Sequence, residues 1–207
     1  DSIIGILSQS AEYNIDQFQI SAWRSQIDVL KRSVTCFEGK IFFEFIIPRM
    51  GKRIDVVIVT MQHVYVIEFK TGNSEYSKAA IDQVWDYALD LKNFHETSHH
   101  ATIIPILVVD DKKLGYLNLN FASYEDNTLR PIALNYEYLN EAFIELKSVQ
   151  SSGSVDYNIW EFGQYSPTPT IIQAAIALYD SHSVKDITRN DAKENLVNTS
   201  QAVNDII

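Results

Sequence analysis

Two apolar segments decide the fold of this chain: GKRIDVVIV (residues 51–59) and VYVIEFK (residues 64–70). Both are rich in β-branched residues and apolar almost throughout, which is typical of strands that are covered on both faces. If they pair as an antiparallel hairpin, the start of one strand lies beside the end of the other. Asp55 is then expected to lie close to Glu68 and Lys70, which are two residues apart and share a face.

The segments on either side of this hairpin predict an α/β domain. Apolar residues recur at helical spacing from Ile20 to Val34, with Ser21 as the expected N-cap, and a later short helix is expected to be capped by Asn140. The expected order is a helix over 20–34, strands over 41–47, 54–60 and 64–69, a helix over 76–94, strands over 101–109 and 132–134, and the helix after Asn140. This order predicts a layered domain with a sheet flanked by helices.

The C-terminal quarter is expected to differ from the rest. Residues 1–150 hold all the strands expected above, and SSGS (151–154) is typical of a loop or linker. A helix is expected beyond Pro169 and another from about Asn190, and the second reaches the last residue without a stop signal. We therefore expect a core domain over 1–150 and a mostly helical extension over 151–207 that leads into a further domain.

Composition narrows the class of protein. The chain has 207 residues, a net charge of −10, a single cysteine and no apolar run long enough to cross a bilayer. These features predict a cytoplasmic protein that does not enter the membrane, and the acidic charge argues against a protein that coats nucleic acid. Basic residues gather between Lys31 and Arg53, where they form either a local basic patch or ordinary solvated charges.

The convergence of charges at the end of an apolar hairpin calls for a chemical reason. Ionised carboxylates are costly to bury there unless a cation compensates them, and Mg²⁺ prefers such oxygen ligands. Asp55 and Glu68 are the expected ligands, and the carbonyl oxygen of Phe69 could add another. Lys70 would stabilise developing negative charge or orient a water molecule, and Lys52 and Arg53 would hold phosphates. The alternative is an ordinary ion pair, either Lys70 with Asp55 or Glu68 with Arg53.

Glu44 is a further candidate for the same site. If the first hairpin turns around residues 50–51, Glu44 lies nearly opposite Val57 and on the same face as Asp55. It is then expected to be an additional metal ligand, and the alternative is a charge that faces solvent on an edge strand.

The long helix offers two more residues, because Gln83 and Tyr87 are four apart and share a helix face. The whole arrangement resembles the PD-(D/E)XK nuclease superfamily, in which a helix, a hairpin with an Asp, a strand ending in (D/E)-x-K and a second helix follow one another. Gln83 and Tyr87 match the Q-x-x-x-Y motif of its RecB-like members, while Ile54 replaces the proline that often precedes the Asp.

The resemblance implies a fold, an activity and a site. The fold is a restriction-endonuclease-like three-layer core with a central mixed β-sheet flanked by helices. The activity is Mg²⁺-dependent hydrolysis of phosphodiester bonds, with Mn²⁺ able to substitute and DNA favoured over RNA as the nucleic acid. The implied catalytic residues are Asp55, Glu68, Lys70, Gln83 and Tyr87.

A wider set of residues is similar to the nuclease-like N-terminal region of bacterial proteins that end in a Schlafen-like superfamily-one DNA/RNA helicase. This resemblance implies a helicase domain in the same polypeptide, although no G-x-x-x-x-G-K-[ST] phosphate loop occurs in these 207 residues. It rests on Trp23, Gln26, Leu30, 43–45, 53–55, 67–70, Gln83, Tyr87, Phe94, His95 and 167–169.

Two other functions stay open. The fold could be a catalytically silent module for nucleic-acid binding or docking, although a degenerate copy should have lost part of the catalytic set. The chain could also be an unrelated α/β enzyme that acts on a small phosphorylated metabolite, which predicts a deep pocket. The histidines at 95, 99 and 100 could bind Zn²⁺, but a solvated helix end is the expected role.

Overall fold

The computed structural model describes residues 2–10, 17–35, 37–47, 52–70, 76–110, 124, 126–151 and 153–166. Its main elements are α1 (Ser2–Ser10), α2 (Gln17–Ser33), β1 (Gly39–Ile47), β2 (Lys52–Thr60), β3 (His63–Lys70), α3 (Lys78–Phe94), β4 (Thr102–Val109), β5 (Ile132–Asn135) and α4 (Leu139–Leu146). The α/β prediction and the order of the expected elements are confirmed, whereas α1 was not expected. The two helices expected after Pro169 lie outside the described residues.

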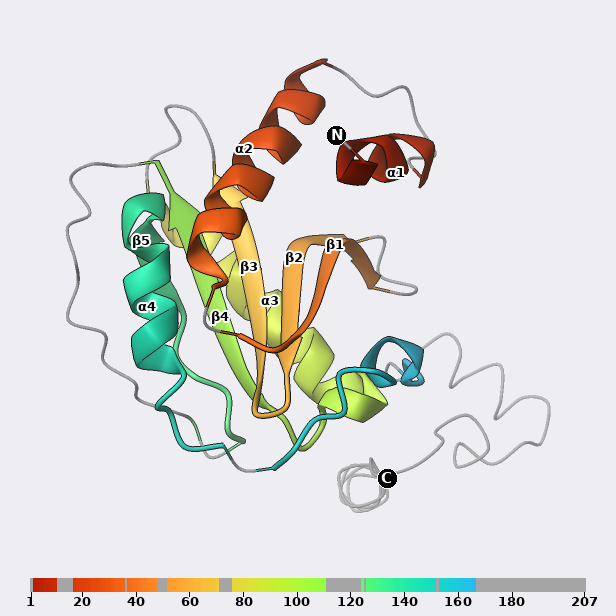
Figure 1. The fold of residues 1–207 in the computed structure, drawn as a ribbon. Coiled ribbons are helices and arrows are strands. Elements are labelled where there is room, and N and C mark those ends of the chain that lie inside the picture. The colour runs from red at the N-terminus through yellow and green to blue at the C-terminus, as the bar shows by residue number, and fades with distance from the viewer. Residues whose placement is uncertain are drawn as a thin grey trace, which may run out of the picture.

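The five strands form one mixed sheet in the order β1-β2-β3-β4-β5 (Figure 1). β1, β2 and β3 are antiparallel neighbours, as the hairpin prediction requires, whereas β3, β4 and β5 run parallel. The connection between β3 and β4 contains α3, because two parallel strands cannot be joined by a tight turn. The charged ends of β2 and β3 therefore lie at one end of the sheet, beside the start of α3.

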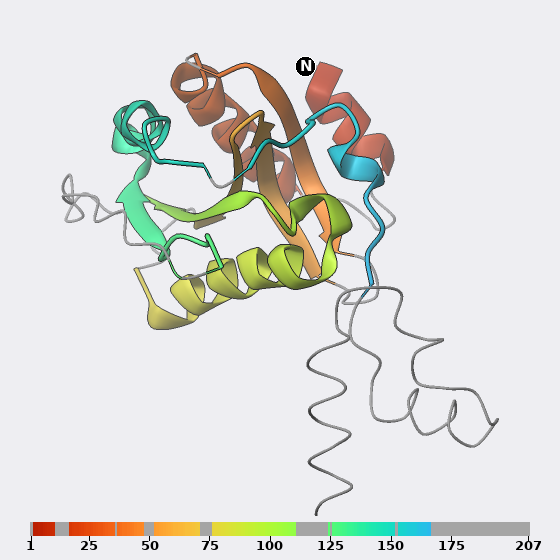
Figure 2. The same cartoon turned by 90° about the horizontal axis from the view of Figure 1, so that it is seen from below.

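Helices cover both faces of the sheet, so the molecule has three layers. Figure 2 shows α3 on one side of the strands and α2 and α4 on the other. The side chains of β2 alternate accordingly: Val57 and Val59 join the core under α3, while Val56 and Ile58 join the core under α2 and α4. Coverage on both sides explains why these strands are apolar almost throughout.

β1 breaks this alternation at Glu44. Phe42 and Phe45 are three residues apart, yet both pack on the core under α3, while Phe43 packs on the opposite side. The cause is the backbone of Glu44, whose φ is 54°, in the left-handed region that side chains other than glycine seldom adopt. The expected register was also wrong: Phe42 pairs with Val57, which places Glu44 opposite Asp55.

Both N-cap predictions were wrong. α2 begins at Gln17, so Ser21 lies inside the helix, where its hydroxyl donates to the Gln17 carbonyl oxygen at 3.0 Å. A 3₁₀ turn over residues 136–138 precedes α4, which places Asn140 inside that helix. The cap of this turn is Asn135, whose side chain accepts from the backbone N–H of residue 137. When a helix begins before the first residue of its apolar stripe, the residue expected as its N-cap lies inside the helix.

Residues 153–166, the described start of the expected extension, pack on the core. Trp160 is fully buried, and its ring lies 5.2 Å from that of Phe42 and 5.0 Å from that of Phe45. Its indole N–H donates to the Ser98 hydroxyl at 2.9 Å. The segment therefore shares the hydrophobic core of the preceding domain.

The predicted solvated helix end agrees with the exposure of His100 but not with the burial of His95. His95 is only 2% exposed, and its Nδ1 lies 2.8 Å from the Ser98 hydroxyl. Burial, followed by the neighbouring His99, lowers the pKa of His95 to about 4. That prediction was wrong for His95, because the segment from Trp160 to Tyr165 covers this ring. No helix in the described ranges is long and apolar enough to cross a membrane.

Candidate functional site

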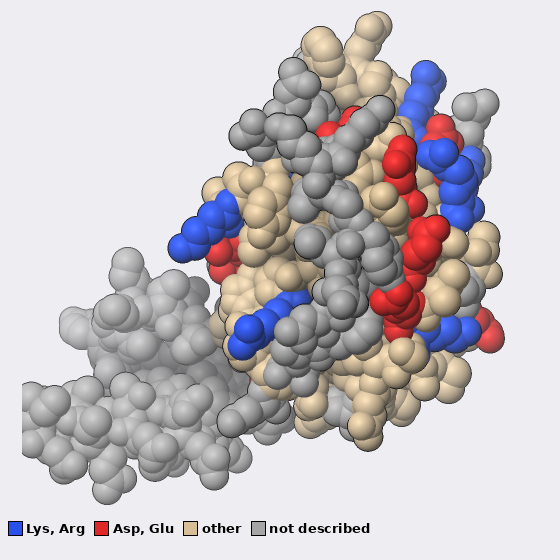
Figure 3. Space-filling model, turned by 90° about the vertical axis from the view of Figure 1, so that its left-hand side faces the viewer, with Lys and Arg blue, Asp and Glu red and all other residues tan. Residues whose placement is uncertain are grey.

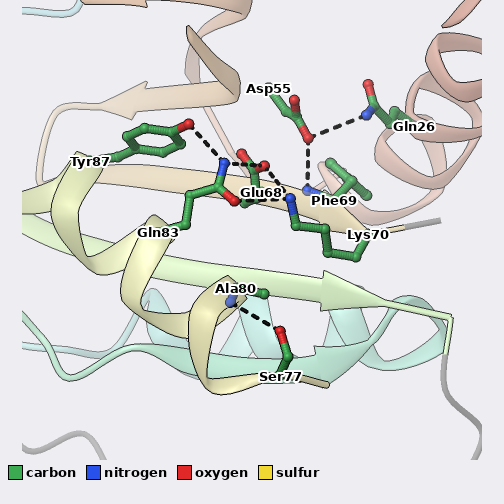
Figure 4. Close-up of polar contacts among 9 residues, drawn as sticks. All are labelled: Gln26, Asp55, Glu68, Phe69, Lys70, Ser77, Ala80, Gln83 and Tyr87. Carbon is green, nitrogen blue, oxygen red and sulfur yellow. Dashed lines mark hydrogen bonds and ion pairs between the residues drawn. The ribbon is translucent and has the colours of Figure 1, made fainter. Parts of the chain in front are cut away.

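The predicted charges meet where β2 begins and β3 ends (Figure 4). Asp55 accepts a hydrogen bond from the backbone N–H of Phe69 at 2.9 Å, which joins the two strands directly. Lys70 donates to Oε1 of Glu68 at 2.9 Å, and Glu68 is only 4% exposed. The ion pair in this structure is therefore Lys70 with Glu68, and neither of the pairings expected as the alternative is found among the described residues.

α3 brings Gln83 and Tyr87 to the same point. The Gln83 amide donates to Glu68 Oε1 and to the Tyr87 hydroxyl, both at 2.8 Å, and its oxygen accepts from Lys70 at 3.0 Å. Ser77 fixes the start of this helix, since its hydroxyl accepts from the Ala80 N–H at 3.2 Å (Figure 4). The prediction that Gln83 and Tyr87 point together at the charged strand ends is confirmed.

α2 reaches the centre from the opposite face of the sheet, which sequence reasoning did not assign to the site. The Gln26 amide lies 3.5 Å from Oδ2 of Asp55, and the Trp23 indole donates to Oε1 of Glu44. The two residues are three apart and share a helix face. The signal in the sequence was Gln26 itself, a polar residue in an otherwise apolar helical stripe.

Glu44 lies at the centre but is bound by protein donors. Its side chain is 14% exposed and forms an ion pair with Arg53, besides accepting from Trp23. The solvent-facing alternative is therefore wrong. Within the described ranges no group of three Asp, Glu, His or Cys residues is arranged to hold one metal ion. Glu44 is thus not assembled with Asp55 and Glu68 as a third carboxylate ligand.

The two expected phosphate contacts are also engaged with acids. Arg53 pairs with Glu44, and Lys52 lies 3.5 Å from Asp90 and over the ring of Tyr87. Lys40 pairs with Glu161 in the same way. On the surface seen in Figure 3, acidic and basic side chains lie next to one another. Of the basic residues between Lys31 and Arg53, three are therefore each paired with an acid: Lys40, Lys52 and Arg53.

Electrostatics at the centre favour a bound cation. Burial raises the pKa of Asp55 to about 7, and the charge of Glu68 adds to this effect. Burial likewise raises the pKa of Glu68, although Lys70 opposes the shift. Oε2 of Glu68 is buried and accepts no hydrogen bond within the described chain. Two crowded carboxylates and an unpaired buried oxygen are suited to Mg²⁺, which binds one or two carboxylates and keeps several waters.

The shifted pKa of Asp55 predicts a pH-dependent stability of the metal-free protein. Between the ordinary pKa of 3.8 and about 7, the folded state holds a proton at Asp55 that the unfolded chain has lost. The free energy of unfolding therefore falls as the pH rises through this window. Asp55→Asn removes the effect, so its thermal midpoint should rise above that of the wild type progressively across the window.

Thermal unfolding without metal over a series of pH values measures this gap. Asp28→Asn, on the exposed side of α2, is the matched control and should follow the wild type throughout. A gap between Asp55→Asn and the wild type that is equal at all pH values would contradict the shifted pKa.

A cavity of about 570 Å³ lies at the other end of the sheet. It is formed around the β2–β3 turn by residues 60–63, with Phe37, Lys147 and Ser151. None of the predicted site residues lines it, so it is not the deep pocket that an enzyme for a small phosphorylated metabolite would have at its charged residues.

The centre is thus built from both helical layers. Asp55, Glu68, Lys70, Gln83 and Tyr87 lie together as the sequence predicted, while Lys52, Arg53 and Glu44 lie beside them in ion pairs. Comparisons of the chain with protein-family models, with curated proteins and with solved structures found no match.

Proposed function

We propose that this chain is a metal-dependent nuclease domain with a restriction-endonuclease-like PD-(D/E)XK core, which hydrolyses phosphodiester bonds of nucleic acid, DNA in preference to RNA. The observation that carries the proposal is the contact of Lys70 with both Glu68 and Gln83, beside a second, half-buried carboxylate, Asp55. A five-stranded mixed sheet between layers of helices supports it.

Each residue has a role that follows from its contacts. Asp55 and Glu68 would hold Mg²⁺, or Mn²⁺ in its place, through one oxygen each that accepts no hydrogen bond from the described residues. The ion, when bound, polarises the phosphodiester and lowers the pKa of water. Lys70 places its ammonium group beside these carboxylates, where it stabilises negative charge that develops on the phosphate. Gln83 holds both Glu68 and Lys70, and Tyr87 holds Gln83, so these two are positioning residues.

The acidic surface bears on how substrate is held. The chain has a net charge of −10, and both Lys52 and Arg53 are paired with acids. Affinity for nucleic acid depends on the number of phosphates that free cations neutralise, so we expect weak binding by this domain alone. A helicase domain in the same polypeptide, which we include in the proposal, would supply further phosphate contacts.

The test is cleavage of fluorescently labelled single- and double-stranded DNA and RNA with Mg²⁺, Mn²⁺ or a chelator. Wild-type protein should cut at least one substrate in the presence of metal, and Asp55→Ala should abolish cutting. Asp28→Ala, which removes an exposed carboxylate from α2, is the matched control and should retain activity. If neither the domain nor the longer protein with ATP cuts any substrate, a catalytically silent module becomes the better explanation.

A further inference from the structure

Gln26 is buried in a way that an ordinary helix residue is not. It is 6% exposed, and its neighbours along α2, Trp23 and Ile27, pack in the apolar core beneath α1. Its amide oxygen is buried and accepts no hydrogen bond within the described chain. A buried polar atom without a partner is destabilising and therefore asks for an explanation.

The neighbour of Gln26 fixes the direction of its amide. Asp55 Oδ2 already accepts from the Phe69 N–H, and the Gln26 amide nitrogen lies 3.5 Å from the same oxygen. With a divalent ion bound, the Asp55 carboxylate is ionised and only accepts hydrogen bonds, so the NH₂ group faces it and the carbonyl oxygen faces away. In Figure 4 this oxygen and the other carboxylate oxygen of Asp55 lie on the same side of the contact.

The second oxygen of the Asp55 carboxylate also lacks a donor among the described residues. Oδ1 of Asp55 accepts no hydrogen bond from any residue that the structure describes, since both donors that reach this carboxylate meet Oδ2. Two acceptors on adjacent side chains, one anionic and one neutral, thus lack donors at the same centre. No described residue supplies the missing donor, and water is the smallest molecule that can do so.

We propose that Gln26 is a positioning residue of the carboxylate centre: its N–H holds Asp55, and its carbonyl oxygen accepts from a water of the divalent ion's hydration shell. The inference rests on the proposed function, which supplies the ion. Mg²⁺ and Mn²⁺ sites of few carboxylates keep several waters, and groups that hydrogen-bond to ligands and waters around a metal strengthen its binding.

A purely structural role for Gln26 and a positioning role predict different effects of its replacement on stability and on metal affinity. The contact with Asp55 is long, at 3.5 Å, and the unpaired oxygen opposes folding. Methionine has a similar length and no strong hydrogen-bonding group, so it should fill the same space without destabilising the protein. A positioning role predicts that metal affinity falls while stability does not.

The experiment measures Mn²⁺ binding by electron paramagnetic resonance, without nucleic acid, and thermal unfolding without metal. Gln26→Met should raise the Kd for Mn²⁺ about 10-fold and leave the unfolding midpoint unchanged or higher. Ile27→Met, a change of similar size at the next position of α2, should bind Mn²⁺ like the wild type. Gln26→Ala, which adds no bulk, should weaken binding in the same way and is decisive if the methionine variant does not fold.

The outcomes separate this inference from the proposed function. If the wild type binds Mn²⁺, Asp55→Ala loses it and Gln26→Met binds as tightly as the wild type, the role of Gln26 is overturned while the metal centre stands. If the wild type binds no Mn²⁺, the metal-dependent function falls, and the role of Gln26 falls with it.

Discussion

Replacing Lys70 by methionine is expected to lower the rate of nucleic-acid cleavage about 100- to 1000-fold, the usual effect of losing one group that stabilises charge in a transition state. The Lys70 ammonium group is held by Glu68 Oε1 at 2.9 Å and by the Gln83 oxygen at 3.0 Å, so its position is fixed before substrate binds. Methionine keeps the length of the side chain but removes the charge. Single-turnover cleavage with saturating Mg²⁺ isolates the chemical step.

The matched control is Lys40→Met. Lys40 also pairs with a glutamate, Glu161, at 3.2 Å, but it lies opposite Val59 at the other end of β2. Its loss should leave the cleavage rate unchanged, because an exposed ion pair contributes little to stability. A Lys70→Met protein that cuts as fast as Lys40→Met would remove Lys70 from the catalytic set.

Trp160→Ala is expected to reduce the free energy of unfolding by about 3–5 kcal/mol, as for other large aromatic residues removed from a core. The indole is fully buried, packs on the rings of Phe42 and Phe45, and donates to the Ser98 hydroxyl. Its removal leaves a cavity and an unused acceptor in the layer beneath β1. Equilibrium unfolding in urea measures the loss.

Phe162→Ala is the control for Trp160→Ala. Phe162 lies two residues away in the same segment and is 76% exposed. Its replacement should change stability by less than about 0.5 kcal/mol. Equal and small effects of the two substitutions would show that residues 153–166 do not share the core in solution.

The hairpin and the residues it brings together could be predicted because they depend on local features. Strands that are apolar throughout indicate coverage on both faces, and an antiparallel turn brings the start of one strand to the end of the next. These two facts place Asp55 beside Glu68 and Lys70 without knowledge of the rest of the chain. Gln83 and Tyr87 are four residues apart, so they share a helix face, and that face could be predicted to point at these three residues.

The parts that could not be predicted depend on packing between distant segments. Arg53 forms an ion pair with Glu44 because the backbone of Glu44 turns its side chain toward Arg53. The φ of 54° at Glu44 could not be predicted from the phenylalanines and isoleucines around it. The contact of Gln26 with Asp55 depends on how α2 crosses the end of the sheet. The burial of His95 depends on Trp160, which follows it by more than sixty positions.

The unusual backbone of Glu44 also affects how molecules of this protein meet one another. Among the described strands β1 is an outer one, so one row of its N–H and C=O groups has no neighbour among them. Such a row is a template for a strand from another molecule and a common start of aggregation. At Glu44 the chain leaves the extended conformation, which interrupts the row near its middle. We therefore expect the residue that helps to shape the carboxylate centre also to disfavour edge-to-edge association of the protein.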